Sequence, residues 1–85
     1  MKLFFVYNPM SGRGQIRNKL FDIINVFSEA GYEITVHPTR APKDATAVVA
    51  ELSDTYDLVV CSGGDGTLDE VMTGMMQRKN KLPVG

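Results

Sequence analysis

The run Gly63-Gly64-Asp65-Gly66-Thr67 combines residue types that could hold a phosphate and support chemistry on it. Its three glycines let the backbone approach a ligand closely, because no Cβ atom intrudes. The run joins a short apolar stretch, Leu58-Val59-Val60, to apolar residues at helical spacing, so it lies between a strand end and a helix start. Free backbone N–H groups and the helix dipole favour an anion there. The acid in its middle, Asp65, suits a phosphate that arrives with Mg²⁺, or a hydroxyl that must lose a proton.

A second glycine-rich turn, Ser11-Gly12-Arg13-Gly14, follows Asn8-Pro9 near the N-terminus. To match a dinucleotide-binding loop it would need a third glycine at the position of Arg17. The second predicted strand ends at His37, where such folds place an acid for the ribose. The sequence therefore disfavours a hydride-transfer cofactor. It also lacks a Walker-type Gly-Lys-Ser/Thr loop, and its single histidine offers little for zinc chemistry.

The rest of the sequence predicts the elements that position these turns. Lys2 to Tyr7 is a nearly continuous apolar run, typical of a strand covered on both faces. Tyr32 to His37 and Tyr56 to Cys61 predict two more strands. A helix is expected after each strand, because apolar residues recur at helical spacing. The three apolar faces are Ile16, Leu20, Ile23, Ile24, Phe27 and Ala30; Ala45, Val48, Val49 and Leu52; and Leu68, Val71, Met72, Met75 and Met76.

The third helix is expected from Thr67 to about Arg78. Asp69 and Glu70 would lie at its start, and Arg78 and Lys79 near its end, as the helix dipole favours. Thr67 and Glu70 also match a capping box, Thr-x-x-Glu, which is a purely structural explanation of both residues.

The alternation of strands and helices predicts an α/β fold, an open three-layer sandwich with a mostly parallel sheet of βαβαβα order. Gly31 predicts the cap that ends the first helix, and Lys81 to Gly85 predicts the approach to a fourth strand. Ligands of such sheets bind at the carboxyl ends of the strands. Both glycine-rich turns and the loop from Pro38 to Pro42 fall at those ends.

The composition describes an ordinary soluble domain. The 85 residues carry a net charge of −1, with 22% charged and 44% hydrophobic residues, which gives no electrostatic case for nucleic acid or an anionic membrane. The single cysteine, Cys61, excludes an internal disulfide, and we interpret it as a small buried hydrophobic residue. No apolar run is long enough to span a membrane, and the N-terminus does not match a signal peptide. We expect a cytoplasmic protein, and the abrupt end suggests a fragment of a longer one.

Together, Asn8-Pro9-Met10-Ser11-Gly12 and the run from Gly63 to Val71 resemble the catalytic domain of the diacylglycerol kinase and sphingosine kinase lipid kinases, in particular its bacterial soluble branch. That family has Asn-Pro-x-Ser-Gly and later Gly-Gly-Asp-Gly-Thr-Leu-Asn-Glu-Val, and this sequence departs from the second motif only at Asp69. Thr39 followed by Asp44-Ala45 resembles the family's second-strand loop. The Gly-Gly-Asp-Gly turn also occurs in NAD kinases and phosphofructokinases, but its combination with the first motif is more specific.

The resemblance implies the NAD kinase/diacylglycerol kinase-like, ATP-binding subdomain of a lipid kinase that uses Mg²⁺. Such an enzyme transfers the γ-phosphate of ATP to the hydroxyl of diacylglycerol or a related lipid. Asp65 would be the acid closest to the chemistry, as a base or as a Mg²⁺-linked acid. A following β-rich domain, outside residues 1–85, would hold much of the lipid pocket, so we expect this chain alone to be inactive. The implied nucleotide-binding residues are Asn8, Ser11, Gly12, Arg13, Thr39, Gly63, Gly64, Gly66, Thr67 and Glu70.

Other interpretations stay open at this point. Asn8 before a proline fits an Asx turn, Ser11 fits an N-cap, and Arg13 fits a solvated surface charge. The chain could belong to a kinase of another hydroxyl substrate, such as NAD. It could also be a non-catalytic nucleotide-binding module, which is supported by Asp69 in place of asparagine and by the short length of 85 residues. Met72, Met75 and Met76 are expected to pack in the core, and any of them left exposed would favour homo-oligomers. Peripheral contact with a membrane is compatible with a lipid acceptor.

Overall fold

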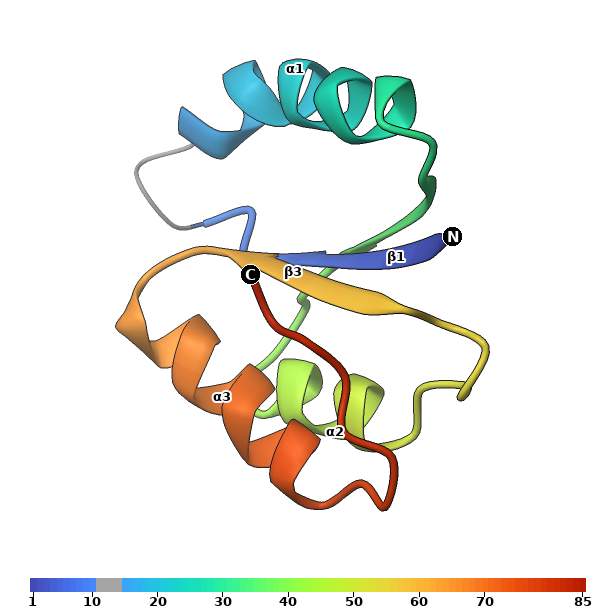
Figure 1. The fold of residues 1–85 in the computed structure, drawn as a ribbon. Coiled ribbons are helices and arrows are strands. Elements are labelled where there is room, and N and C mark those ends of the chain that lie inside the picture. The colour runs from blue at the N-terminus through green and yellow to red at the C-terminus, as the bar shows by residue number, and fades with distance from the viewer. Residues whose placement is uncertain (11–14) are drawn as a thin grey trace.

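The computed structural model describes residues 1–10 and 15–85, with residues 15–18 described by their backbone alone (Figure 1). Strands and helices alternate along the chain, which confirms the predicted α/β order. The elements are β1 (Lys2–Tyr7), α1 (Gln15–Glu29), β2 (Glu33–Pro38), α2 (Asp44–Ala50), β3 (Leu58–Ser62) and α3 (Asp65–Met76).

The sheet has the order β2-β1-β3, and both strand pairs are parallel. The central strand β1 is buried on both faces, as its continuous apolar run predicts: Leu3 and Val6 have no exposed surface, and Phe4 and Phe5 have at most 5%. In the register of the sheet, Tyr7 lies opposite both Pro38 and Ser62. The carboxyl ends of the three strands therefore meet at one edge.

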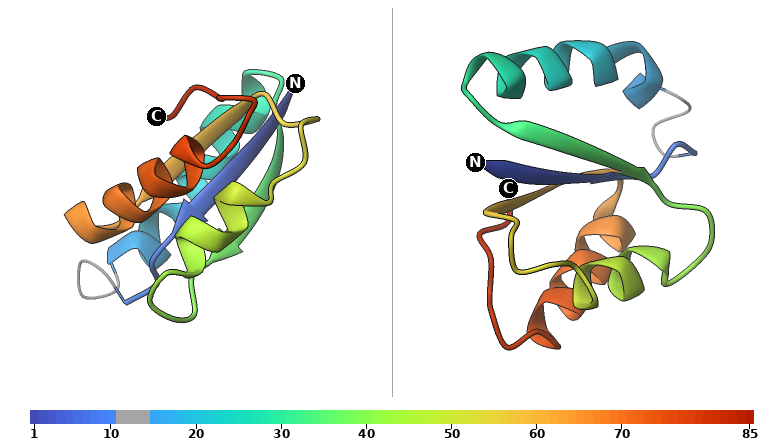
Figure 2. Two further views of the ribbon diagram at one scale, coloured as in Figure 1. Left: turned by 90° about the horizontal axis from the view of Figure 1, so that it is seen from below. Right: turned by 90° about the vertical axis from the view of Figure 1, so that its right-hand side faces the viewer.

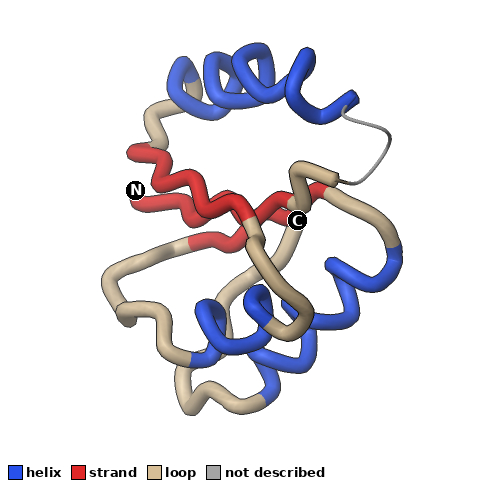
Figure 3. Tube along the Cα trace, turned by 180° about the vertical axis from the view of Figure 1, so that it is seen from behind, coloured by secondary structure: helices blue, strands red, loops and turns tan. Residues whose placement is uncertain are grey.

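Helix α1 covers one face of the sheet, and α2 and α3 together cover the other (Figures 1 and 2). Seen from behind, the strands form a thin layer between the two helical layers (Figure 3). The main core lies on the α2/α3 side, where alternate residues of β1 meet both helices and β3. Its buried residues are Phe4, Val6, Ala45, Val49, Val59, Val71 and Met75.

The end of α1 is fixed by a Schellman motif at Gly31. Gly31 has a φ of 96°, and its N–H donates to the Ser28 carbonyl at 3.0 Å, while the Tyr32 N–H donates to the Phe27 carbonyl at 3.1 Å. The rings of Phe27 and Tyr32 pack edge to face with centroids 6.0 Å apart. The prediction that Gly31 caps this helix is confirmed.

Helix α3 differs from its prediction at both ends. It begins at Asp65, two residues before Thr67, and it ends at Met76, before Arg78. Asp65 is therefore the acid of the first turn, and Asp69 and Glu70 lie further along the helix. The expectation that basic residues occupy the end of the helix was wrong, because its last turn contains none.

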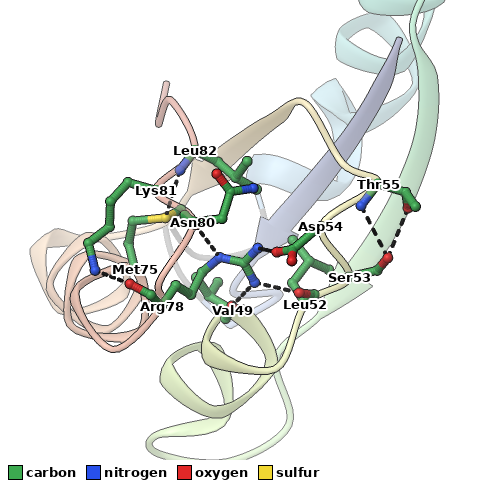
Figure 4. Close-up of polar contacts among 10 residues, drawn as sticks. All are labelled: Val49, Leu52, Ser53, Asp54, Thr55, Met75, Arg78, Asn80, Lys81 and Leu82. Carbon is green, nitrogen blue, oxygen red and sulfur yellow. Dashed lines mark hydrogen bonds and ion pairs between the residues drawn. The ribbon is translucent and has the colours of Figure 1, made fainter.

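Arg78 has a different role from the one predicted. Only 6% of it is exposed, and its guanidinium donates to the carbonyls of Val49, Leu52 and Asn80 and to the carboxylate of Asp54 (Figure 4). Because Val49 and Leu52 lie at and just after the end of α2, the buried cation supplies donors to carbonyls at this helix end. The Val49 carbonyl also accepts a hydrogen bond from the Leu52 N–H at 3.2 Å. The side chain ties the end of α2 to the segment after α3.

The methionines of α3 do not all pack as predicted. Met75 is buried, but Met72 is 44% exposed and Met76 is 74% exposed. Leu68, on the same predicted face, is 45% exposed. After α3 the chain returns to the sheet, where Val84 forms a parallel bridge with Val59 and the Gly85 N–H donates to the Val59 carbonyl at 2.8 Å. The predicted approach to a fourth strand is confirmed. Within the described part of the chain, no helix has the length and apolar character that crossing a bilayer requires.

Candidate functional site

The loops after β1 and β2 and the turn after β3 begin side by side at the carboxyl edge of the sheet. The Thr39 N–H donates to the Tyr7 carbonyl at 2.9 Å, and the Asn8 N–H donates to the Ser62 carbonyl at 3.1 Å. Parallel pairing thus continues one residue past β1 and one residue past β2, and it anchors the loops that follow these two strands. This is the edge at which open α/β sheets bind ligands.

A cleft of about 340 Å³ opens at this edge. It is bounded by the loop after β1, the loop between β2 and α2, and one side of α3. Its lining includes four residues that the sequence analysis proposed for nucleotide binding: Asn8, Thr39, Thr67 and Glu70. The other lining residues are Met10, Arg40, Ala41, Pro42 and Ala45. None of these five was proposed from the sequence as a nucleotide-binding residue, although Met10, Pro42 and Ala45 lie in the segments that carry the motifs.

The N-cap of α3 is Gly64, which has an extended backbone, and no side chain caps this end of the helix. The N–H groups of Thr67 and Leu68 donate to the Gly64 carbonyl at 3.0 and 3.3 Å. The N–H groups of Asp65 and Gly66 precede these bonds and have no partner within the helix. The capping-box interpretation was wrong, because Thr67 lies inside the first turn and does not begin the helix. The start of α3 therefore offers backbone donors and the positive end of a helix dipole to an anion.

Two glycines of this turn have different environments. A Cβ atom at Gly63 would lie 2.5 Å from the Thr67 hydroxyl oxygen, so packing inside the chain requires glycine there. A Cβ atom at Gly66 would meet no atom within 4 Å. Gly66 is exposed and helical, a setting in which glycine costs about 1 kcal/mol relative to alanine. Close approach of a ligand would explain a glycine that packing does not require.

Asp65 lies on a different side of the helix from the cleft. Together with Gly63 and Gly64 it lines a second hollow, of about 270 Å³, that also includes Cys61, Leu68 and Gly85. The first turn of α3 separates this hollow from the cleft of Thr67 and Glu70. Gly66 is part of the lining of neither. Seven of the proposed site residues therefore fall into two groups on either side of one helix start, with Gly66 between them.

Of the site residues predicted in the first glycine-rich turn and just before it, the structure describes only Asn8. The Asn8 amide oxygen accepts a hydrogen bond from the Met10 N–H at 2.9 Å, so the Asx turn is present in a residue that also lines the cleft. The proposed residues Ser11, Gly12 and Arg13 lie outside the residues that the structure describes.

The acids near the turn fit a magnesium ion that arrives with a nucleotide better than one held by the chain alone. In the described ranges, no three His, Cys, Asp or Glu side chains gather around a common point. Mg²⁺ is usually held by one or two carboxylates together with substrate phosphates and waters. Asp65 is exposed beside the free N–H groups of the helix start, so it could supply one such carboxylate.

The fold and the site define a class: a parallel α/β domain in which a helix start offers free backbone N–H groups at the carboxyl edge of the sheet. Within that class, the family model described as diacylglycerol kinase catalytic domain matches residues 2–85, and the chain belongs to this family.

Similar proteins and structures agree with the family match. The chain is 37% identical over 81 residues to "Diacylglycerol kinase" of Bacillus subtilis (strain 168), an alignment that covers 94% of the chain and 27% of that protein. It is 36% identical over 81 residues to "Diacylglycerol kinase" of Staphylococcus aureus (strain bovine RF122 / ET3-1), which covers 94% of the chain and 26% of that protein. A solved structure titled "A putative diacylglycerol kinase from Bacillus anthracis str. Sterne" superimposes with a TM-score of 0.87 and 26% identity, covering 98% of this chain and 30% of the other. The chain thus spans about a quarter of the length of these relatives.

Proposed function

We propose that this chain is the ATP-binding part of a lipid kinase that transfers the γ-phosphate of ATP to the hydroxyl of diacylglycerol or a related lipid. The family assignment supports kinase chemistry, and the names of the relatives support diacylglycerol as the acceptor. The observation that most supports ATP binding is the cleft, because the first turn of α3 forms one of its walls.

In this proposal the nucleotide lies in the cleft and its phosphates extend around the start of α3. Asn8 and Thr39 would contact it from the two loops, and Thr67 and Glu70 from the helix. The free N–H groups of Asp65 and Gly66 would donate to phosphate oxygens. Phosphoryl transfer is accelerated mainly by positioning and by stabilisation of charge, which is what this arrangement of donors provides.

Asp65 would act on the far side of the helix start, in the hollow that also includes Gly63 and Gly64. A triphosphate that passes over Gly66 would bring its terminal phosphate toward this hollow. There the Asp65 carboxylate could accept the proton of the lipid hydroxyl, or hold a magnesium ion that the phosphates also bind. Mg²⁺, when bound, would supply positive charge to the phosphate oxygens.

In this proposal the binding site for the lipid acceptor lies outside the cleft and the hollow described above. Because the chain spans about a quarter of its curated relatives, we propose that a following, β-rich domain holds most of the lipid pocket. We also propose that the protein acts in the cytoplasm and reaches its lipid by peripheral contact with a membrane. On this view residues 1–85 alone bind ATP and do not phosphorylate lipid.

The test is a phosphotransfer assay of a full-length enzyme that contains this chain, with diacylglycerol and NAD supplied as alternative acceptors. Asp65→Asn keeps the shape of the side chain and removes its charge, so we expect a loss of at least about 100-fold in rate. The matched control is Asp69→Asn, which restores the residue usual in the family's motif and should leave the rate within about threefold of the wild-type rate. An unchanged rate in Asp65→Asn would refute the role of Asp65, and phosphorylation of NAD in place of lipid would refute the acceptor.

A further inference from the structure

One wall of the cleft, the loop from Thr39 to Pro42, is held by a side chain that does not itself line the cleft. The Asp44 carboxylate accepts a hydrogen bond from the Arg40 N–H at 2.8 Å. The Asp44 N–H in turn donates to the Ala41 carbonyl at 3.2 Å, so the loop and the first residue of α2 are joined in both directions. Of these residues, Arg40 and Ala41 line the cleft.

The same carboxylate is anchored to the sheet through His37. The His37 Nε2 atom lies 3.3 Å from both carboxylate oxygens of Asp44. The His37 ring stacks on the buried ring of Phe4, with centroids 5.8 Å apart and an angle of 29° between the planes. Both members of the pair are largely covered, with side-chain exposures of 30% and 23%. Asp44 is therefore fixed relative to β1 and β2, the strands that carry the other cleft loops.

The loop between His37 and Asp44 has little conformational freedom. The Thr39 N–H is bound to the Tyr7 carbonyl at 2.9 Å, and Lys43 adopts the left-handed conformation, with a φ of 70°, at the junction with α2. Between these points the loop is held by two bonds to Asp44: the Arg40 N–H donates to its carboxylate, and its N–H donates to the Ala41 carbonyl. The first of these bonds fixes Arg40, the residue after Thr39, at the wall of the cleft.

We propose that Asp44, held by His37, is a positioning residue for nucleotide binding: it fixes the Thr39–Pro42 loop as a preformed wall of the cleft. This inference rests on the proposed function. Its physical basis is preorganisation, because a loop that is already ordered loses less conformational entropy when a ligand binds. The competing explanation is that Asp44 only stabilises α2, as an acid in the first turn of a helix does.

The experiment measures binding of Mg·ATP to the protein and to variants by calorimetry, together with amide hydrogen exchange without nucleotide. Asp44→Ala removes the acceptor of the Arg40 N–H, so we expect ATP affinity to fall about tenfold and the Arg40 amide to exchange faster. Asp44→Asn keeps an acceptor oxygen and should recover most of the affinity. His37→Phe keeps the ring on Phe4 and removes Nε2, so its affinity should lie between those of the wild type and Asp44→Ala.

The matched control is Ala47→Gly, at an exposed position of α2 that does not line the cleft. It lowers helix stability and leaves the contacts of Asp44 in place. If Ala47→Gly weakens ATP binding as much as Asp44→Ala does, or if Asp44→Ala binds as tightly as the wild type, the positioning role is wrong. If the wild type itself does not bind ATP, the proposed function fails separately. Exchange of the Arg40 amide then decides the inference, because an unchanged exchange rate in Asp44→Ala would overturn it.

Discussion

In the turn between β3 and α3, Gly63 packs so closely against Thr67 that a Cβ atom at position 63 would lie 2.5 Å from the Thr67 hydroxyl oxygen. Thr67, a polar residue in the first turn of a helix, is only 7% exposed, and Gly63 is one of the residues that cover it. The turn thus holds the Thr67 side chain at the wall of the cleft. Gly63 has a structural function that Gly66, three residues further along, does not share.

The first prediction concerns Gly63→Ala. The added methyl group must displace Thr67, so we expect a loss of about 1–3 kcal/mol in the free energy of unfolding. The φ of 156° at Gly63 adds to this loss, because alanine adopts that conformation rarely. Urea unfolding of the protein measures the effect. Unchanged stability would mean that the turn can relax without moving Thr67.

The second prediction is the opposite behaviour at Gly66→Ala. A Cβ atom there meets nothing within the chain, and alanine is the better helix residue, so stability should stay equal or rise by up to about 1 kcal/mol. ATP affinity should nevertheless fall at least about tenfold, because the methyl group would occupy the space through which we propose the phosphates approach. Calorimetric titration with Mg·ATP checks this. A variant that is more stable and binds ATP as tightly as the wild type would remove the argument that a ligand approaches Gly66.

The third prediction concerns the buried Arg78. Replacing it with methionine keeps the apolar stem and removes the donors to the carbonyls of Val49, Leu52 and Asn80, so we expect a loss of about 2–4 kcal/mol in unfolding free energy. Asp54 is the control, because its side chain is 78% exposed and its 2.8 Å ion pair with Arg78 is open to solvent. Asp54→Ala should cost less than about 1 kcal/mol. Equal losses in both variants would show that the ion pair, and not the carbonyl contacts, stabilises this junction.

Features that depend on residues close together in the chain could be predicted from the sequence. The apolar run of β1 indicated a strand buried on both faces, and Gly31 indicated a helix end, because each depends on neighbours in the chain. The first turn of α3 was mispredicted, although its residues are local. Thr67 and Glu70 match a capping box, but contact with Gly63 buries Thr67 and the helix begins earlier.

Features that depend on distant partners could not be predicted. No pattern near Arg78 indicates that its guanidinium reaches the end of α2, which lies more than twenty residues away in the sequence. The candidate site could be predicted only in part. The motifs identified Asn8, Thr39, Thr67 and Glu70, which do line one cleft, but they did not reveal that Asp65 lies across the helix from it.

The fourth prediction concerns the contact between α2 and α3. A Cβ atom at Gly74 would lie 2.5 Å from the backbone carbonyl oxygen of Thr46, so the two helices approach each other through a glycine. The Thr46 hydroxyl also donates to the Glu70 carbonyl at 2.8 Å. Gly74→Ala should separate the helices and cost about 1–3 kcal/mol in unfolding free energy, despite the better helix propensity of alanine. Because Glu70 and Ala45 lie on opposite sides of this contact and both line the cleft, ATP affinity should fall as well. A more stable Gly74→Ala variant would show that the helices can separate at no cost.

The last prediction concerns the pH dependence of Cys61. Cys61 is half-buried, not fully buried as the sequence predicted. This partial burial raises the pKa of its thiol above the ordinary value, because the thiolate loses solvation in the folded protein. The folded state therefore retains its proton at a pH where the unfolded chain has begun to lose it. This contribution to stability is intact below about pH 8.5 and decreases as the pH rises from there through the folded pKa. Alkylation of the thiol by iodoacetamide should accordingly be slower than that of a free cysteine peptide at pH 8, with a midpoint at higher pH.

Cys61→Ala provides the control for this measurement, because the chain has no other cysteine and the variant should take up no label. Cys61 shares its hollow with Gly63, Gly64 and Asp65, so Mg·ATP should slow alkylation further if the phosphates reach that side of α3. Labelling at the rate of the free peptide would contradict the raised pKa. Labelling that is slow but insensitive to Mg·ATP would leave the thiol's burial intact and count against the proposed path of the phosphates.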